Sequence, residues 1–563
     1  MINLKHYSNG LTAGIAVLIG VLSFYQVVGL RALDFSNILW LTTSSDTFTQ
    51  YLGWEFFRKD DWRWPLGSNP NYGLEFSSSV IFSDSIPLVS IPLKLFAKAL
   101  PDVFQFAGYW LLVCFVLQAY YTIKLVQLTT PSRMIAGAAA VLFSFAPAFL
   151  WRLHSHSLFA HWLVLMALYI YLSNEKDDLK HKAKWIALLT ASVLVHTYFL
   201  GMLSVIWIAD IAQRNSEFGR DFKSRWAEIG LTMAAIGAAL WAAGFFPLTT
   251  SYLSGGYGFH RFNLTSLFNP QGGMNADNDI WSQLMPPLPQ GPGDYEGYSF
   301  LGLGGIMALL CALPAFWMSR RNILSSKMVP LLAACAVLFL FALSNKIGIG
   351  ARTFEIWIPE ILIQAASTMR ASGRFFWPIY YLILLYALNL IIKNYDKKIA
   401  SWLIFIFAVA QVYDTRPGWL ALQDNFNLVG TDWKNTLNRD DIIQMAKKYE
   451  KIRALPAENA IKDWDKISYL ALKSGLPTDV TYLARANGAA YKRAANAAKS
   501  SIEDGLLDRR ALYFLTEEYA VRMQAVMGKE DRLYKVGDQY IYAANWNISR
   551  DPKLDLAPSP RNR

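Results

Sequence analysis

Long apolar runs recur along the first three quarters of this sequence and constrain its fold more than any other feature. An α-helix needs about 17 to 22 apolar residues to cross a hydrocarbon core of roughly 30 Å. Eleven runs are predicted to be spans, near residues 11–30, 106–123, 134–150, 157–173, 185–198, 200–212, 228–247, 299–317, 328–344, 374–392 and 399–414. The fifth and sixth are short, so a re-entrant pair is the alternative there. The chain is predicted to be a polytopic α-helical membrane protein.

The composition agrees with a membrane protein, and the charge distribution explains the net charge. The chain is 54% hydrophobic and only 17% charged, and its mean hydropathy is +0.23. A formal charge of +11 is also typical of nucleic-acid binding. With a cytoplasmic N-terminus, however, every predicted inside loop is basic, whereas the outer loop 151–156 has only Arg152 and the outer loop 248–298 only Arg261. This is the positive-inside pattern, and it requires no nucleic-acid partner.

The N-terminal apolar run and the three cysteines each have an alternative interpretation, as a signal peptide and as a disulfide or metal site. Lys5 followed by apolar residues is also typical of a secretory signal peptide. The run is longer than a usual signal core and GLRALDFS has no small-x-small cleavage site, so we expect a retained span. Cys114, Cys311 and Cys335 each lie in a predicted span, which predicts neither a disulfide framework nor a thiolate metal site.

The predicted spans divide the chain into a membrane module and a soluble domain. An odd number of spans leaves the chain outside the cytoplasm at residue 415. Residues 416–563 have no spanning run and alternate helical and strand-like stretches, which predicts an extracytoplasmic α/β domain after the module 1–415. Three outer segments, 31–105, 248–298 and 345–373, are too long for connectors. Irregular backbone cannot face lipid, so they are expected at the interface or over a cavity.

The first outer segment opens with SSDTFTQYLGWEFFRKDDWRWPLG, residues 44–67. Phe48, Tyr51, Leu52 and Phe56 follow spacings of three and four, which predicts a helix lying along the membrane surface. Together with FSDSIPLVSIPLKL and MRASGRFFWPIYY, this stretch resembles an uncharacterised bacterial family within the GT-C superfamily of membrane glycosyltransferases. The architectural resemblance covers the whole chain, whereas the motifs cover a small part of it.

The resemblance implies a GT-C-like fold of about 11 membrane helices with a C-terminal soluble α/β domain. It also implies a glycosyltransferase of the bacterial inner membrane whose active site is extracytoplasmic. Its expected partners are a polyprenyl-phosphate-linked sugar donor, a surface glycan or glycolipid acceptor, and membrane lipid. A glycolipid transporter or flippase, or another glycan-modifying enzyme, is the alternative. A transporter usually has ionisable residues within spans and repeated halves, and the predicted spans contain few such residues and no visible repeat.

Sugar transfer to a hydroxyl requires a carboxylate that accepts the hydroxyl proton. Asp46 is the first-loop acid that matches the family position for this base. Its alternative role is an N-cap, which stabilises a helix by about 1 kcal/mol. Asp84, before the rigid Ser-Ile-Pro, is the second candidate acid. Asp60 and Asp61 are interpreted as part of a solvated ion-pair cluster.

The departing phosphate requires cations, for which the arginine fork is well suited. Arg370 and Arg374 lie four residues apart at the start of the tenth run, so a helix would place both on one face at the outer surface. The alternative is snorkelling at a span end. Arg152, His154 and His156 form a second candidate group for donor phosphate. With His161 they can also be interpreted as a metal site or as structural residues, although no acid accompanies them.

The glycine-rich outer loop 248–298 is predicted to cover the substrate and contains His260 and Arg261. Its Asp277 and Asp279 can hold a divalent cation with diphosphate, but an isolated Asp-x-Asp is also typical of a turn. We therefore assign no metal site and no certain cofactor, and a divalent cation stays an alternative.

Overall fold

The computed structural model describes residues 9–546 except 77, 174–178, 219–221, 246–255, 274–278, 319–327, 460, 485–487 and 504–506. The chain divides into two compact units, which are described separately. Unit 1 comprises Met1–Trp40, Phe106–Gly237 and Leu253–Val429, and unit 2 comprises Leu41–Gln105, Ala238–Tyr252 and Gly430–Arg563. Residues 41–105 of the first outer segment thus share a unit with the C-terminal residues. The predicted domain boundary at residue 415 stays a prediction.

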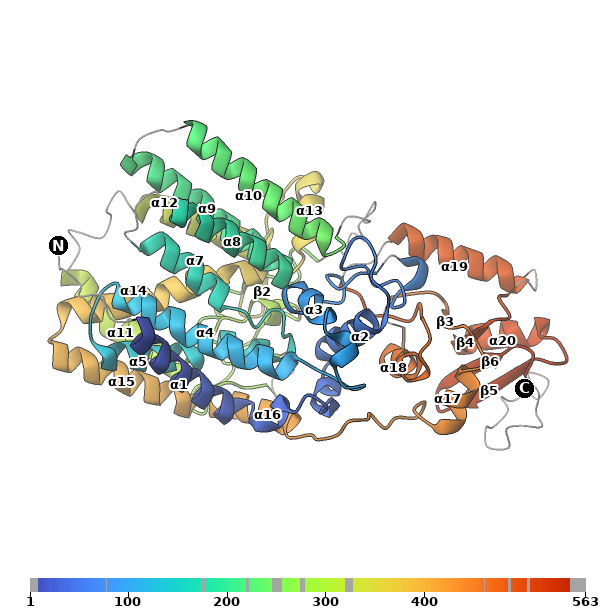
Figure 1. Ribbon diagram of the computed structural model, residues 1–563. Coiled ribbons are helices and arrows are strands. Elements are labelled where there is room, and N and C mark those ends of the chain that lie inside the picture. Colours follow the sequence, from blue (N-terminus) through green and yellow to red (C-terminus); the bar gives the residue numbers. More distant parts are fainter. Residues whose placement is uncertain are drawn as a thin grey trace. The chain divides into compact units, whose positions relative to one another are not determined.

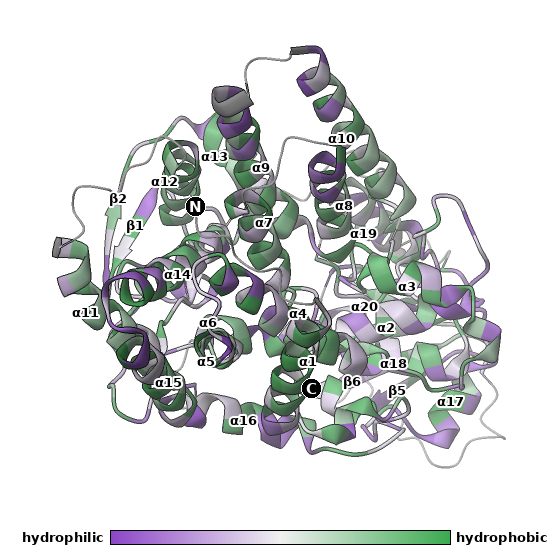
Figure 2. Ribbon diagram, turned by 60° about the vertical axis from the view of Figure 1, so that its left-hand side comes forward, coloured by the Kyte–Doolittle hydropathy of each residue, from purple (hydrophilic) through white to green (hydrophobic). Residues whose placement is uncertain are grey.

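Unit 1 is built mainly of apolar helices, and every predicted apolar run contains one (Figures 1 and 2). They are α1 (Asn9–Val27), α4 (Ala107–Gln127), α5 (Arg133–Ser144), α6 (Pro147–Leu150), α7 (Trp162–Leu172), α8 (Leu179–Val195), α9 (Thr197–Phe218), most of α10 (Phe222–Ala242), α11 (Gly302–Met318), α12 (Val329–Leu343), α13 (Glu360–Ala366), α14 (Trp377–Asn394), α15 (Lys397–Asp414) and α16 (Arg416–Phe426). An antiparallel hairpin of β1 (Lys346–Ile349) and β2 (Arg352–Glu355) follows α12.

Fewer helices satisfy the criteria for a membrane span than the sequence predicted. Within the described ranges, three are long and apolar enough: Gly10–Val27, Ala107–Gln127 and Ser372–Asn394. Two bent pairs raise this number to five, namely Arg133–Ser144 with Pro147–His154 and Lys397–Asp414 with Arg416–Phe426. Helices such as α7 and α12 are shorter than the roughly 20 residues that a straight span needs. The count of eleven spans is therefore not confirmed.

A buried charge network joins α8, α9 and α10. Arg214 on α9 donates to Asp210 at 2.7 Å and to Glu228 of α10 at 2.6 and 3.0 Å. His181 of α8 lies 3.0 Å from Asp210, and Arg225 lies 3.5 Å from Glu228. Because these charges neutralise one another, the helices can bury them together.

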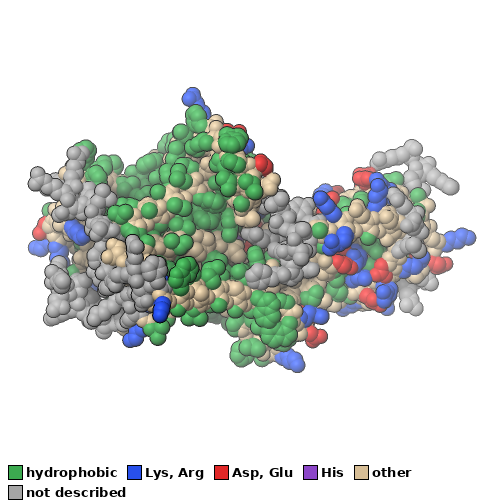
Figure 3. Space-filling model, turned by 90° about the horizontal axis from the view of Figure 1, so that it is seen from above, with side chains coloured by type: hydrophobic (Ala, Val, Ile, Leu, Met, Phe, Trp, Pro, Cys, Tyr) green, Lys and Arg blue, Asp and Glu red, His purple; other side chains and the backbone are tan. Residues whose placement is uncertain are grey.

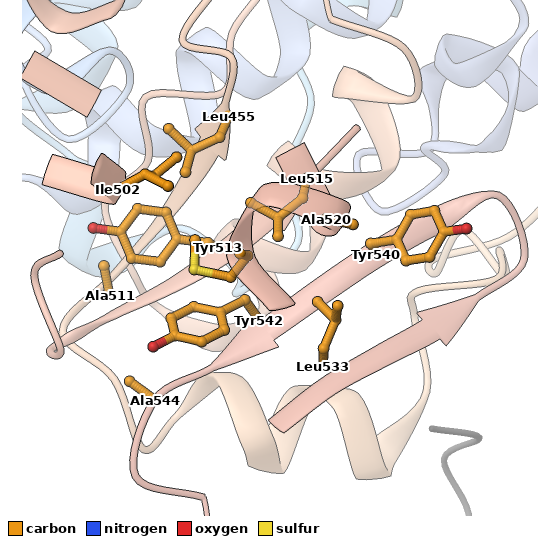
Figure 4. Close-up of a cluster of buried hydrophobic side chains, with 11 residues drawn as sticks. Leu455, Ile502, Ala511, Tyr513, Leu515, Ala520, Leu533, Tyr540, Tyr542 and Ala544 are labelled. Atoms are coloured by element: carbon orange, nitrogen blue, oxygen red, sulfur yellow. The ribbon is translucent and has the colours of Figure 1, made fainter. Parts of the chain in front are cut away.

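Unit 2 combines helices with a four-stranded sheet. Its elements are α2 (Ser45–Lys59), α3 (Pro87–Lys94), α17 (Asp440–Ala446), β3 (Lys451–Leu455), α18 (Trp464–Ser474), α19 (Gly488–Glu503), β4 (Ala511–Leu515), α20 (Glu517–Val526), β5 (Arg532–Val536) and β6 (Gln539–Ala543). The strand order is β3-β4-β6-β5, with β3 and β4 parallel and the other pairs antiparallel. Side chains such as Tyr513, Met523, Leu533 and Tyr542 pack on it (Figure 4).

The face drawn in Figure 3 has apolar side chains over one part of the chain and charged side chains over another. Hydrophobic side chains gather over helices of unit 1, whereas Lys, Arg, Asp and Glu gather over the C-terminal part of the chain (Figure 3). This is the distribution expected when lipid surrounds one part and water the other.

The helix predicted after the first span exists, but its expected position along a surface is wrong. The twelve consecutive residues Thr47 to Arg58 of α2 are buried. The Phe48 ring lies 4.9 Å from Trp433, and the Phe56 ring lies 5.1 Å from Tyr72. The polar side is buried as well, because Arg58 pairs with the completely buried Glu55 at 2.6 Å. The amphipathic pattern thus reflects an internal ion pair.

Candidate active site

Two arginines that were predicted from separate parts of the sequence share one carboxylate in unit 1. Arg152 Nη1 donates to Glu296 Oε2 at 2.8 Å, and its Nη2 donates to the backbone carbonyl oxygen of Glu296 at 2.6 Å. Arg374 Nε and Nη2 donate to the same Oε2 at 3.0 and 2.9 Å. The 3₁₀ turns Trp151–His154 and Ser372–Phe376 present the two side chains. The tertiary fold therefore joins Arg152 and Arg374 into one group.

The electrostatics of this group favour an additional anion. Burial opposes ionisation of Glu296, but Arg374 and Arg152 outweigh it and hold the pKa of Glu296 well below its usual range. Two guanidinium groups against one carboxylate leave an excess positive charge. Aromatic rings fix both cations, because the Arg152 guanidinium lies 4.3 Å from the Trp151 ring and that of Arg374 lies 4.7 Å from the Tyr198 ring.

Arg370 adds a third, exposed positive charge. It forms no ion pair within the part of the chain that the structure describes. Burial lowers the pKa of His260, and although Glu296 opposes this, Arg370 and Arg374 lower it further, so His260 is neutral at neutral pH. Arg370 and Arg374 do not lie on one continuous helix, because a 3₁₀ turn begins at Ser372 between them. We call Arg152, Arg370, Arg374 and Glu296 the arginine group.

An apolar surface lies just before Arg370 in the chain. It is formed by the hairpin, α13 and the residues between them, and no residue of α13 is buried. The exposed fractions of its large apolar side chains run from 43% to 84%, for Ile349, Phe354, Ile356, Trp357, Ile361 and Leu362. Single exposed apolar residues are ordinary, but six within residues 349–362 favour a lipid or ligand contact.

Of the histidines near Arg152, His156 and His161 are buried and His154 is half-buried. His156 packs its ring 5.3 Å from the Trp40 ring, and burial lowers its pKa to about 3, so it is neutral. His154 lies against Trp151 with ring centroids 4.7 Å apart. His161 Nδ1 lies 2.8 Å from the Tyr381 hydroxyl. Among the described residues, no three His, Cys, Asp or Glu side chains are placed to hold a metal ion.

The side chains of the outer loop residues Arg261 and Asp279 are held by hydrogen bonds within the protein. Arg261 is 5% exposed, bonds to Asp294 at 3.0 Å and donates to the Lys346 carbonyl oxygen at 2.7 Å, so it ties the loop to the hairpin. The carboxylate of Asp279 accepts from Trp151 at 2.9 Å and from Trp281 at 2.7 Å. Asp277 lies outside the described residues. The substrate role of His260 and Arg261 stays a prediction.

Asp46 belongs to unit 2 and is not the N-cap of α2. The N-cap is Ser44, with extended backbone angles, and Asp46 lies in the first helical turn. The capping alternative for Asp46 is therefore wrong. An acid in this turn still interacts favourably with the helix dipole, by about 0.3–1 kcal/mol. Asp46 is partly exposed, unlike the residues that follow it.

The turn that contains Asp84 packs against the same helix. Ser83 and Ser85 hydroxyls lie 2.9 Å apart, and Ser85 Oγ donates to the Gln50 carbonyl oxygen at 2.9 Å. A Cβ at Gly53 would lie 2.2 Å from Ser83 Oγ, so the close approach requires glycine. Gln50 is one turn of α2 beyond Asp46. Both predicted acids thus belong to one unit: Asp46 lies on α2, and the turn that contains Asp84 packs against the same helix.

The apolar helices of unit 1 and the sheet of unit 2 define a class, an α-helical membrane protein with a C-terminal α/β part. Within that class, the chain belongs to the DUF6311 family. The model for the domain of unknown function DUF6311 matches residues 17–416, and the model for its C-terminal domain matches residues 441–544. No curated protein matches the chain.

Solved structures that are similar to the chain include two membrane enzymes. The oligosaccharyltransferase of Archaeoglobus fulgidus, tethered to an acceptor peptide, is 12% identical with a TM-score of 0.43, covering 98% of this chain and 76% of its own. ArnT of Cupriavidus metallidurans, bound to undecaprenyl phosphate, is 10% identical with a TM-score of 0.46, covering 97% of this chain and 100% of its own. Both belong to the GT-C superfamily, which the sequence also resembles.

Proposed function

We propose that this protein is a membrane glycosyltransferase. In this proposal it transfers a sugar from a polyprenyl-phosphate-linked donor to a hydroxyl of a surface glycan or glycolipid, on the extracytoplasmic side of the bacterial inner membrane. The observation that supports it most is the arginine group, in which Arg152 and Arg374 share the Glu296 carboxylate and Arg370 adds a third positive charge that acts on His260. With His260 neutral, this group has a net charge of +2, which suits a phosphate.

The apolar surface before Arg370 favours a lipid-linked donor over a soluble one. A polyprenyl phosphate has an anionic head and a long hydrocarbon chain. The arginine group suits the head, because guanidinium forks match phosphate oxygens. The exposed apolar side chains of the hairpin and α13 suit the chain. A water-soluble sugar nucleotide has no hydrocarbon chain that could cover this apolar surface.

The proposed chemistry assigns a role to each group. Asp46 accepts the proton of the acceptor hydroxyl as its oxygen attacks the anomeric carbon of the donor sugar. The bond from this carbon to the phosphate oxygen breaks, and its electron pair stays on the phosphate. Arg370, Arg374 and Arg152 stabilise this negative charge. Asp84 is proposed as a second catalytic acid.

The remaining candidate residues are assigned supporting roles in substrate binding. His154 and His156 are proposed to assist donor binding as neutral hydrogen-bonding groups. His260 and Arg261 are proposed to belong to the loop that covers the substrate, Arg261 acting through the position of the hairpin. A divalent cation stays an alternative that a chelator would test, since a cation-dependent enzyme loses turnover with EDTA and regains it with added Mg²⁺ or Mn²⁺.

The proposal is tested with the full chain in proteoliposomes, supplied with radiolabelled polyprenyl-phosphate sugars and lipid-linked glycans. Asp46→Asn should lower turnover by about 10²–10⁴-fold, the usual effect of removing a general base, and leave donor binding unchanged. The helix should persist, because its N-cap position is Ser44 and not Asp46. Asp61→Asn, an exposed acid of the same segment, is the control and should retain activity.

Two results would contradict this proposal. Near-wild-type turnover of Asp46→Asn would remove Asp46 as the base and make Asp84 the leading candidate. Movement of glycolipid across the bilayer without any transfer of sugar would favour the flippase alternative. Mass spectrometry of surface polysaccharide and lipid-linked glycans, with and without the gene, identifies the acceptor class.

A further inference from the structure

Within unit 2, the sheet extends beyond β3 into the first outer segment. Thr478 N donates to the Asn71 carbonyl oxygen at 2.9 Å, and Gly73 N donates to the Thr478 carbonyl oxygen at 2.8 Å. On the sheet side, Ile452 N of β3 donates to the Pro477 carbonyl oxygen at 3.0 Å. Thr478 forms parallel bridges with both Tyr72 and Ile452. Residues 71–73 thus follow residues 477–478 at the β3 edge of the sheet.

Side chains reinforce this connection. Arg453 on β3 forms an ion pair with Glu75 of the first outer segment. The Phe76 ring stacks on Tyr491 of α19, with centroids 3.6 Å apart and planes 16° apart. Both rings are buried, with exposed fractions of 2% and 5%. The C-terminal residues therefore hold the segment before Asp84 through backbone, ionic and aromatic contacts.

One more backbone hydrogen bond from the C-terminal residues adjoins the turn that contains Asp84. Ala484 N donates to the Phe82 carbonyl oxygen at 2.8 Å. Two residues later, Asp84 has φ +52°, in the left-handed region. Aspartate tolerates this region better than most non-glycine residues, but the conformation still needs support from its surroundings. On the far side of the turn, Ser85 Oγ donates to the Gln50 carbonyl oxygen of α2. The turn is thus held at both ends.

We propose that the C-terminal domain is a positioning element of the transferase, and that its segment 477–484 together with Tyr491 holds the Asp84 turn in its reactive conformation. This inference rests on the proposed role of Asp84 in glycosyl transfer. Neither Thr478 nor Tyr491 contacts substrate in this scheme. They act through the backbone of residues 71–85, so their loss should lower kcat and leave the KM for donor unchanged.

The test compares two substitutions that shorten a side chain in the C-terminal domain, each made in the full chain. Tyr491→Ala removes the stack on Phe76, whereas Tyr491→Phe retains it. Leu533→Ala removes a buried side chain of β5, which is the strand at the opposite edge of the sheet from β3 (Figure 4). It therefore destabilises the domain without touching the first outer segment. Turnover and hydrogen–deuterium exchange of residues 71–85 are measured for each variant in proteoliposomes.

We expect Tyr491→Ala to lower kcat by about 10- to 100-fold, as a misplaced catalytic group does, with faster exchange over residues 71–85. Tyr491→Phe should restore both, and Leu533→Ala should change neither. An unchanged kcat in Tyr491→Ala, or an equal loss in Leu533→Ala, would overturn the inference. If the wild type transfers no sugar, the proposed function fails, and the exchange data alone then test the positioning role: unchanged exchange in Tyr491→Ala overturns it.

Discussion

Replacing Glu296 by glutamine removes the carboxylate charge of the arginine group and keeps the size of the side chain. In the wild type, the side chains of Glu296, Arg152 and Arg374 are 16%, 3% and 11% exposed. The substitution leaves two largely buried guanidinium groups without their counter-charge, and breaking a buried pair costs about 3–5 kcal/mol. We expect about 3 kcal/mol, because Arg152 keeps its bond to the backbone carbonyl of residue 296.

The assay is unfolding of the full chain in detergent, with and without a polyprenyl phosphate. An anion that binds only the folded state stabilises it, by about 2.7 kcal/mol at 100 times its Kd. The added anion should therefore restore most of the stability of Glu296→Gln. The control is Glu355→Gln, whose side chain is 63% exposed and 3.7 Å from Lys346, and which should change stability by less than about 1 kcal/mol.

The contribution of Glu296 to the free energy of unfolding depends on pH, and the direction follows from its lowered pKa. Because the folded pKa of Glu296 is lowered, its contribution to stability is fully present above the unfolded pKa of about 4.3 and is lost as the pH falls through the folded pKa. The stability difference between wild type and Glu296→Gln should therefore be the same at pH 7 and pH 5. Equal stabilities at pH 7, or a difference that disappears by pH 5, would refute the reasoning.

Three further predictions concern the donor site, the Asp84 turn and the topology. Arg370→Ala should raise the KM for donor about tenfold or more, since a lost charge-assisted bond is worth about 1.5–3 kcal/mol; equal effects in the exposed Arg352→Ala control would remove the assignment. Gly53→Ala should lower turnover without stabilising α2, because its Cβ would lie 2.2 Å from Ser83 Oγ; normal turnover would show that the turn can move freely. A reporter that works only outside the cytoplasm should be active when fused after residue 415, and silence there would contradict the span count.

The local pattern of the sequence was sufficient to predict the helices. Apolar runs and their spacing depend on neighbouring residues, so helices over 107–127 and 377–394 follow from local sequence. Residue chemistry was sufficient to single out Arg152, Arg370 and Arg374, because arginine is unusual on the outer side of a membrane. The number of spans was not determined in this way, because short helices and bent pairs have the same composition as full spans.

Only the tertiary structure decided which of these residues meet. Glu296 lies 144 residues from Arg152 and 78 from Arg374, and GDYEGYS has no local feature that distinguishes this acid from others in the loops. The burial of α2 likewise depends on Trp433, which is remote in sequence. Periodicity arises from the bonds between neighbours along the chain, whereas ion pairs and packing arise from contacts between distant segments. A sequence therefore determines which side chains are available, and only the folded chain determines their partners.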